Sequence, residues 1–220
     1  MDYKELNEKR HSTRGFKKDP VARETLEKVL EMATRAVSSQ NTQPWHFAVV
    51  SGEVIEKIRA CNIEDLHAGK PFDYPGGDAK GGVYKDRARA IGKQLYGLMG
   101  IAREDRERRA WWGERGFRFF DAPAVILIYT LDDIPESYNR LNVGCVVQNI
   151  CLAAAELGLG TCAEDQAIYY HRGIKENLQL PENAQLQLGI AIGYEDPEFA
   201  ANEVVSEREP LEKVTEWYGF

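Results

Sequence analysis

The sequence lacks the short motifs that identify several common chemistries. It has no Gly-x-x-x-x-Gly-Lys phosphate loop, no His-Glu-x-x-His zinc pair and no Gly-x-Ser-x-Gly nucleophile elbow. It also lacks a surplus of positive charge, since 28 Lys and Arg against 35 Asp and Glu give a net charge of -7. Nucleic-acid binding depends on cations that displace counterions. The sequence therefore has no motif that indicates ATP binding, zinc binding or acyl-serine chemistry, and we expect no nucleic-acid partner.

Cysteines are few, and long apolar runs are missing. The four cysteines, Cys61, Cys145, Cys151 and Cys162, form no Cys-x-x-Cys pair and mostly lie within apolar runs, which is typical of buried thiols in a reducing compartment. Residues 1–10 are charged and polar, and no stretch is long enough to span a bilayer. We therefore expect a cytoplasmic protein without disulfides or membrane contact.

The composition is that of one ordinary globular domain. With 220 residues, 43% apolar and 29% charged, the chain can bury a large core, and we predict a single domain over residues 1–220. Residues 64–82 are rich in Gly and Pro and are predicted to form a lid. Residues 196–220 carry Trp217, Tyr218 and Phe220, and this C-terminal arm is expected to dock on its own subunit or on a partner.

Hydrophobic periodicity predicts an α+β fold in which helices outnumber strands. Residues 142–157 are apolar nearly all round, which predicts a central helix buried on every side. Gly158 is its expected left-handed cap. The letters of Gly158–Ala163 match a dinucleotide-binding fingerprint, but a helix precedes them where that motif needs a strand, so a helix cap and a tight turn are favoured. The other predicted elements are helices at 20–37, 54–60, 84–109 and 169–178, and strands at 45–50, 124–131 and 186–192.

Two polar segments are candidates for ligand binding. Arg10, Ser12 and Arg14 alternate, so an extended chain would turn two guanidinium groups and a hydroxyl toward one anion such as a phosphate. Basic residues near an N-terminus are more often a solvated face. Residues 38–45, Ser-Ser-Gln-Asn-Thr-Gln-Pro-Trp, could contact a planar heterocycle rich in N and O atoms, although a helix cap and a turn would use the same residue types.

Taken in order, these segments resemble the signature of the nitroreductase flavoprotein family. The resemblance covers nearly the whole chain and is most similar to the branch of bacterial nitrobenzoate and related nitroaromatic reductases. It is carried by Arg10–Arg14, Ser38–Trp45, Gly158–Cys162, Gly193-Tyr194 and Arg208–Leu211, with Gly116–Pro123 and Trp217–Phe220 in support.

The resemblance implies a nitroreductase-like fold, with a small mixed sheet flanked by helices around the central helix, in a domain-swapped homodimer whose C-terminal arms reach the partner. It implies FMN as cofactor, NADH or NADPH as electron donor, and ping-pong reduction of a small, flat, electron-poor aromatic acceptor. FMN carries the hydride chemistry, so no catalytic nucleophile or metal is needed.

The resemblance also implies roles for individual residues. Arg10, Ser12 and Arg208 would hold the FMN phosphate with His11 beside it, and Arg14 would reach the pyrimidine edge of the flavin. Ser38, Ser39, Asn41 and Gln43 belong to the loop that would arrive from the other subunit. Asn142 would make a polar contact to the flavin, and the backbone at Ala163, Glu164 and Asp165 would line the ring near N5. The aromatic residues that could wall the acceptor pocket are Phe72, Tyr74, Trp111, Trp112, Phe119 and Phe120.

Two alternatives stay open. The same fold could carry a flavin-dependent reductive dehalogenase or an ene-type reductase, because fold does not fix the substrate. A non-catalytic flavin-binding redox sensor is a rival of another class. The sequence selects neither the physiological acceptor nor the nicotinamide.

Overall fold

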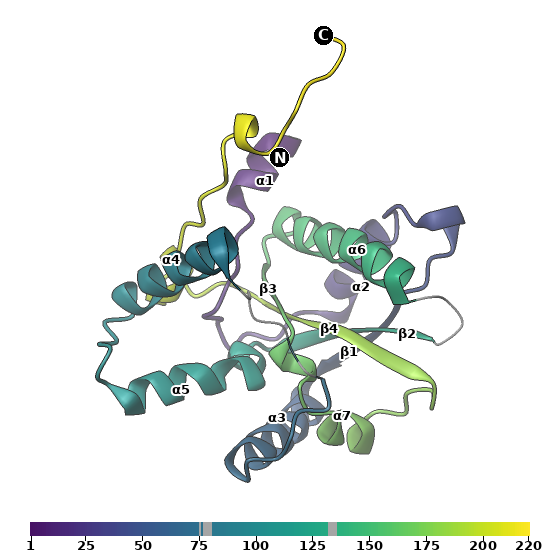
Figure 1. Ribbon diagram of the computed structural model, residues 1–220. Coiled ribbons are helices and arrows are strands. Elements are labelled where there is room, and N and C mark those ends of the chain that lie inside the picture. The colour runs from purple at the N-terminus through teal and green to yellow at the C-terminus, as the bar shows by residue number, and fades with distance from the viewer. Residues whose placement is uncertain (75, 77–80, 132–135) are drawn as a thin grey trace.

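The computed structural model describes residues 1–74, 76, 81–131 and 136–220. Helices cover both faces of a single small sheet (Figure 1). The helices are α1 Tyr3–Lys9, α2 Arg23–Ala33, α3 Gly52–His67, α4 Gly82–Leu98, α5 Arg106–Phe117, α6 Glu136–Glu156 and α7 Arg172–Asn177, with short 3-10 turns η1 Ser39–Asn41, η2 Phe119–Asp121, η3 Gln166–Ile168, η4 Ala200–Glu203 and η5 Leu211–Lys213; the strands are β1 His46–Ser51, β2 Ala124–Leu131, β3 Gly160–Glu164 and β4 Ala184–Gly193. None of the helices in this described part is long and apolar enough to cross a membrane.

The four strands run in the order β1-β2-β4-β3. All three pairings between them are antiparallel, whereas a mixed sheet was expected. Alternate residues of β2 enter two different cores: Val125 and Leu127 face the side of α3, α5 and α7, while Ile126 and Ile128 face α2 and α6. A strand covered on both faces is apolar along its length rather than alternating, which explains the unbroken run at the start of β2.

The predicted strands are confirmed to within two residues, but β3 was missed. Its five residues lie at the sheet edge and pair antiparallel with β4, Gly160 opposite Gly193 and Glu164 opposite Gly189. The sequence analysis interpreted this segment as a tight turn after a helix cap. The cap itself is correct, since Gly158 has a φ of +78° after α6, and helix followed by strand is the reverse of a dinucleotide-binding turn.

Two helix predictions needed correction. The helix expected over 84–109 is two helices, α4 and α5, separated at Gly100, which has a φ of +59°. Arg108 closes the break by donating to the carbonyls of Met99 and Gly100 at 2.8 and 2.7 Å. The helix expected over 54–60 continues to His67, so the irregular part of the predicted lid begins only after that residue.

The described part of the predicted lid lies against α7 and the turn before it. The Asp73 amide donates to the Tyr169 carbonyl at 2.9 Å, and the Phe72 ring packs on Tyr169 and Tyr170. Residues 75 and 77–80 lie outside the described residues. A lid function for this segment stays a prediction.

The central helix α6 is not buried on every side within one subunit. Val146 and Ile150 are fully buried, but Tyr138 and Leu141 are 53% and 68% exposed, and Gln148 is exposed on the same side. An apolar pattern predicts that side chains are buried, but it does not tell whether the residues that cover them belong to the same subunit. The exposed stripe of α6 is therefore a surface that this subunit leaves uncovered.

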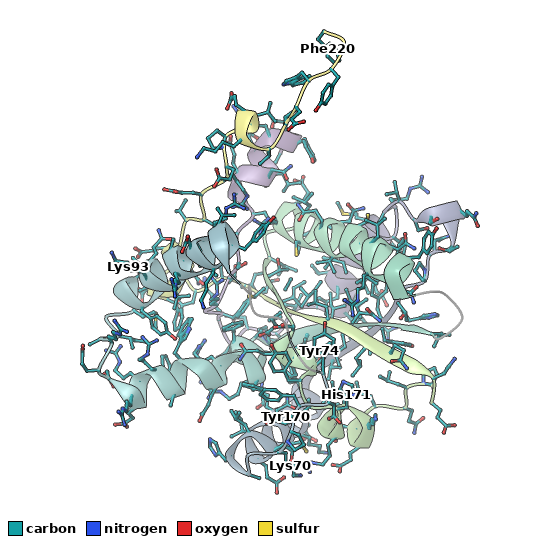
Figure 2. The ribbon with its side chains drawn as sticks, viewed as in Figure 1. Lys70, Tyr74, Lys93, Tyr170, His171 and Phe220 are labelled. Atoms are coloured by element: carbon teal, nitrogen blue, oxygen red, sulfur yellow. The ribbon has the colours of Figure 1, made fainter. Side chains whose placement is uncertain are left out.

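The C-terminal arm extends away from the body of the subunit (Figure 1). Its apolar side chains are exposed over η5 and beyond, and the stick view shows the chain ending at Phe220 far from the sheet (Figure 2). The rings of Trp217 and Phe220 contact each other edge to face, with their centroids 5.5 Å apart. Most of both rings is exposed to solvent. The exposed apolar residues of the arm are Val205, Leu211, Val214, Trp217, Tyr218 and Phe220.

Candidate functional site

The predicted anion-binding segment lies in extended form along the free edge of β3. Ser12 forms a parallel bridge with Thr161, and the Thr13 amide donates to the Thr161 carbonyl at 2.9 Å. The contact is close enough that a Cβ on Gly160 would lie 2.4 Å from the Thr13 hydroxyl oxygen. Glycine is therefore needed at position 160 so that the segment can approach the sheet.

Both peptide groups of Arg14 are held by side chains from distant elements. Its amide donates to the Asn202 Oδ1 at 2.7 Å, and its carbonyl accepts from the Arg115 Nη2 at 2.8 Å. The guanidinium of Arg14 contacts only the Ser12 carbonyl, at 3.3 Å, among the hydrogen bonds of the described residues. Asn202 and Arg115 could not be predicted from the sequence, because an asparagine in an unpatterned tail and an arginine in a charged helix carry no local signal.

Arg10, His11 and Arg208 line one pocket of about 1000 Å³. The pocket lies between α1, α6 and the segment that follows η4, so it brings together arginines from both ends of the chain. His11 contacts the Glu195 carboxylate at 3.0 Å through Nε2. Ser12 does not line this pocket. The remaining lining residues are Tyr3, Lys4, Asn7, Glu8, Gln148, Asn202, Glu203, Val204, Val205 and Ser206.

A second pocket of about 400 Å³ brings Arg14 together with the end of β3. Ala163, Glu164 and Asp165 line it, as the resemblance implied, and Ala163 is exposed there. Two of the aromatic residues proposed as walls, Trp112 and Phe120, line it too, whereas Phe119 is fully buried in the core. The other lining residues are Tyr96, Gly113, Cys162 and Gln166.

Glu164 is a buried carboxylic acid without a hydrogen-bond partner among the described residues. Its side chain is held within the fold, and neither carboxyl oxygen is satisfied. Burial raises the pKa of Glu164 well above its usual value, and the neighbouring Asp165 raises it further, while Arg14 and Arg59 act in the opposite direction. Burial likewise raises the pKa of Cys162 to about 12. The Cys162 thiol is therefore neutral at physiological pH, and burial favours the neutral form of the Glu164 carboxyl.

The loop of Ser38, Ser39, Asn41 and Gln43 lies elsewhere, at the N-terminal half of α6. The Ser39 amide donates to Asn142 Oδ1 at 3.0 Å, and the Gln43 amide donates to Ser38 Oγ at 3.0 Å. Asn142 is buried, and its Nδ2 has no partner among the described residues. None of these five residues lines either pocket. One subunit thus presents two separate halves of the predicted site.

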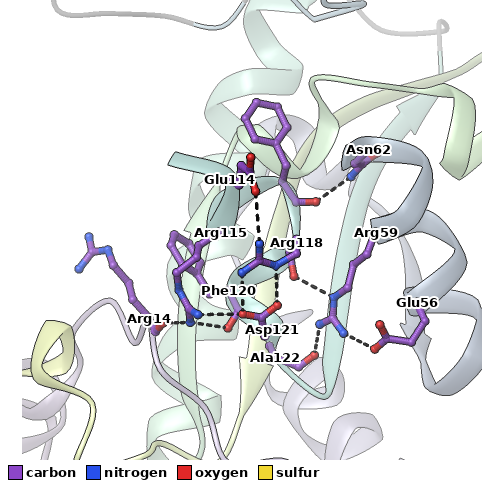
Figure 3. Close-up of polar contacts among 11 residues, drawn as sticks. Arg14, Glu56, Arg59, Asn62, Glu114, Arg115, Arg118, Phe120, Asp121 and Ala122 are labelled. Atoms are coloured by element: carbon purple, nitrogen blue, oxygen red, sulfur yellow. Dashed lines mark hydrogen bonds and ion pairs between the residues drawn. The ribbon is translucent and has the colours of Figure 1, made fainter. Parts of the chain in front are cut away.

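Two buried arginines, Arg59 and Arg115, fix the turn at residues 118–122 next to Arg14 (Figure 3). Phe119, Phe120 and Asp121 all have positive φ, between 50° and 58°, a conformation that costs energy for residues with a side chain. Arg59 donates to the carbonyls of Arg118 and Ala122 on one side of this turn. Arg115 donates to the Phe120 carbonyl at 3.1 Å and to the Asp121 carboxylate at 2.8 Å on the other side.

Comparison with known proteins identifies a family whose model matches most of the chain. Residues 8–194 match the model of the nitroreductase family. The chain is 36% identical over 210 residues to a nitrobenzene nitroreductase from Ectopseudomonas oleovorans, covering 94% of this chain and 92% of that protein. It is 33% identical over 210 residues to a 4-nitrobenzoate reductase from Nocardioides sp., covering 93% of this chain and 85% of that protein.

A solved structure extends the likeness to three dimensions. The crystal structure of an FMN-dependent nitroreductase from Mycobacterium smegmatis in complex with NADPH superposes with a TM-score of 0.91 at 29% identity. The superposition covers 98% of this chain and 97% of that one.

Proposed function

The chain belongs to the nitroreductase family, and we propose that it is an FMN-dependent NAD(P)H oxidoreductase that reduces nitroaromatic or similar flat, electron-poor acceptors. The observation that carries the proposal is the convergence of Arg10 and Arg208, from opposite ends of the chain, on one pocket. Forked guanidinium donors suit a phosphate. This pocket would take the FMN phosphate, with His11 beside it.

The second pocket fits the ring system of the same cofactor. Arg14 would place a positive charge at the pyrimidine edge, where the reduced flavin is anionic. The backbone from the exposed Ala163 to Asp165, at the end of β3, would lie along the ring near N5. Trp112 and Phe120 are apolar walls that exclude water and favour a flat substrate. FMN, when bound, supplies the hydride chemistry, so the protein has only to bind and orient the reactants.

The two halves of the site would meet in a homodimer. The Asn142 Nδ2, which has no partner among the described residues, and the exposed side chains of Asn41 and Gln43 offer polar groups that neither of the two pockets described above uses. They adjoin the uncovered stripe of α6 around Leu141, an apolar surface of the kind that marks a protein interface. A partner subunit packed on this stripe would cover it and carry its Ser38 to Gln43 loop to the flavin.

The C-terminal arms would be exchanged between the two subunits. Its exposed apolar side chains, ending in Trp217 and Phe220, need a surface that the own subunit does not give them. We therefore propose a domain-swapped dimer in which each arm packs on the other subunit. A cytoplasmic location remains our expectation from the four unpaired cysteines.

Anaerobic flavin reduction tests the proposed activity. The protein is reconstituted with FMN, mixed with NADH or NADPH, and then mixed with 4-nitrobenzoate or with a halotyrosine. We expect rapid bleaching of the flavin absorbance by at least one nicotinamide and its rapid return with the nitroaromatic. Return with the halotyrosine alone would favour the dehalogenase. Bound flavin that neither nicotinamide reduces would favour a redox sensor.

A further inference from the structure

Arg115 of α5 lies at the centre of the contacts that fix the backbone of Arg14 (Figure 3). Its side chain is 8% exposed, and its Nη2 bonds the Arg14 and Phe120 carbonyls at 2.8 and 3.1 Å. Its Nη1 bonds the Asp121 carboxylate at 2.8 Å. The guanidinium also lies over the Phe199 ring, 4.7 Å from the centroid. One side chain thus joins a pocket wall, a strained turn and the segment that carries Arg14.

Asn202 fixes the opposite side of the same segment. Its Oδ1 accepts from the amides of Arg14 and Gly15 at 2.7 and 3.0 Å, and its Nδ2 donates to the Gly15 carbonyl at 2.9 Å. Asn202 is itself buried. The amide and the carbonyl of Arg14 are therefore both held by buried side chains, which sets the direction in which its Cα–Cβ bond leaves the chain.

A buried arginine is a costly way to hold a loop. Burial lowers the pKa of Arg115, and the nearby Asp121 carboxylate acts in the opposite direction. Its Nε has no partner among the described residues. An apolar side chain would fill the same space without that cost, but it could not reach two carbonyls and a carboxylate at once, as a planar guanidinium does.

We propose that Arg115, acting with Asn202, is a positioning residue that holds the Arg14 guanidinium at the pyrimidine edge of FMN. The proposal rests on the proposed function, because it needs a flavin in the second pocket. Among the described residues the guanidinium of Arg14 makes one hydrogen bond, a long one to the Ser12 carbonyl, so its position depends on a fixed backbone. If the backbone is loosened, Arg14 keeps its positive charge, but the guanidinium can move away from the ring.

Arg118 provides a matched control. It bonds the same Asp121 carboxylate at 2.8 Å, lies three residues further along the chain, and has no hydrogen bond to Arg14 among the described residues. Arg115→Lys and Arg118→Lys therefore both weaken an arginine contact to Asp121, and only the first releases the Arg14 carbonyl. Each substitution retains the charge.

The experiment measures the FMN dissociation constant and the flavin midpoint potential of both variants, alone and combined with Arg14→Met. We expect Arg115→Lys to weaken FMN binding about tenfold, as the loss of one hydrogen bond to a charged donor predicts, and to shift the potential to lower values. Arg118→Lys should change binding less than about twofold on the same scale. In the Arg14→Met background, Arg115→Lys should change neither quantity further.

The outcomes separate positioning from a merely structural role. Equal effects of Arg115→Lys and Arg118→Lys, or an Arg115→Lys effect that persists with Arg14→Met, would overturn the proposal. If Arg115→Lys does not fold, Asn202→Ala tests the same clamp from its other side, with the same expectation that Arg14→Met abolishes its effect on the potential. Failure of the unaltered protein to bind FMN would instead refute the proposed function.

Discussion

Replacing Glu164 by glutamine should stabilise the protein at neutral pH. The carboxyl is buried without a partner, and its pKa lies well above the usual value of 4.5, mainly because burial penalises the charged form. Glutamine has nearly the same shape and cannot ionise. The Glu164→Gln variant therefore keeps the packing and removes the cost of holding a proton that the unfolded chain would release.

The size of the effect follows from proton linkage. Below the pKa of the unfolded chain both states hold the proton, and the substitution should change the free energy of unfolding little. Above it, only the folded state holds the proton, so the stability of the unaltered protein falls by up to about 1.4 kcal/mol per pH unit until the pKa of the folded state is passed. The advantage of Glu164→Gln should grow over the same window and then level off.

Urea unfolding of the FMN-free protein at a series of pH values measures this difference. We expect the two proteins to be close in stability near pH 4 and the variant to be more stable near pH 7, with a difference that grows by at most about 1.4 kcal/mol per pH unit between them. Glu198→Gln is the matched control, because that carboxylate is exposed. A Glu164→Gln variant that is less stable at every pH, or a difference that does not vary with pH, would refute the reasoning.

Three further predictions concern the first pocket, the buried Cys162 thiol and Asn142. Arg10→Ala and Arg208→Ala should each weaken FMN binding by about 10- to 100-fold, since each removes a charge-assisted contact worth roughly 1.5 to 3 kcal/mol; unchanged affinity in fluorescence titrations would remove the phosphate from this pocket. A disulfide reagent should leave Cys162 of the native protein unmodified, because the thiol is buried and its pKa is raised to about 12; modification before unfolding, detected by peptide mass, would contradict this. Asn142→Ala should weaken FMN binding, because it removes the unpartnered Nδ2 that would contact the flavin, and it should also lower stability, because the Ser39 amide loses its acceptor; equal FMN affinity would exclude a flavin contact.

Much of the fold could be predicted because its signals are local. Helical periodicity located α2, and apolar, β-branched runs located β1, β2 and β4. The bounds expected for the first helix, 20–37, were too wide, since α2 spans Arg23–Ala33 and Ala22 at its start makes no side-chain cap. The strand β3 was missed because its five residues at an edge have no alternating pattern of their own; pairing with β4 defines it. The break at Gly100 was missed because Ile101 and Ala102 continue the apolar face just after the glycine, and the charged residues 103–109 were interpreted as the opposite face of the same helix.

The site was only partly predictable, for a similar reason. The alternation of Arg10, Ser12 and Arg14 predicted side chains that face one anion, but Arg10 and Arg14 line different pockets and Ser12 lines neither. The family resemblance implied Arg208 near Arg10 and residues 163–165 near Arg14, and these residues line the same two pockets. Arg115 and Asn202 act through tertiary contacts with residues 101 and 188 positions away, and no spacing rule covers such distances. Burial on every side was predicted for residues 142–157, where the apolar side chains are indeed covered but Gln148 is exposed; the exposed Tyr138 and Leu141 lie in the part of α6 that precedes the predicted segment.

Sedimentation of the FMN-loaded protein, followed by flavin absorbance over a range of dilutions, tests the shared site most directly. If FMN lies between two subunits, the flavin should sediment only with the dimer and should appear as free FMN once the subunits separate. Flavin that sediments with a single subunit would contradict a site built from two copies of the chain.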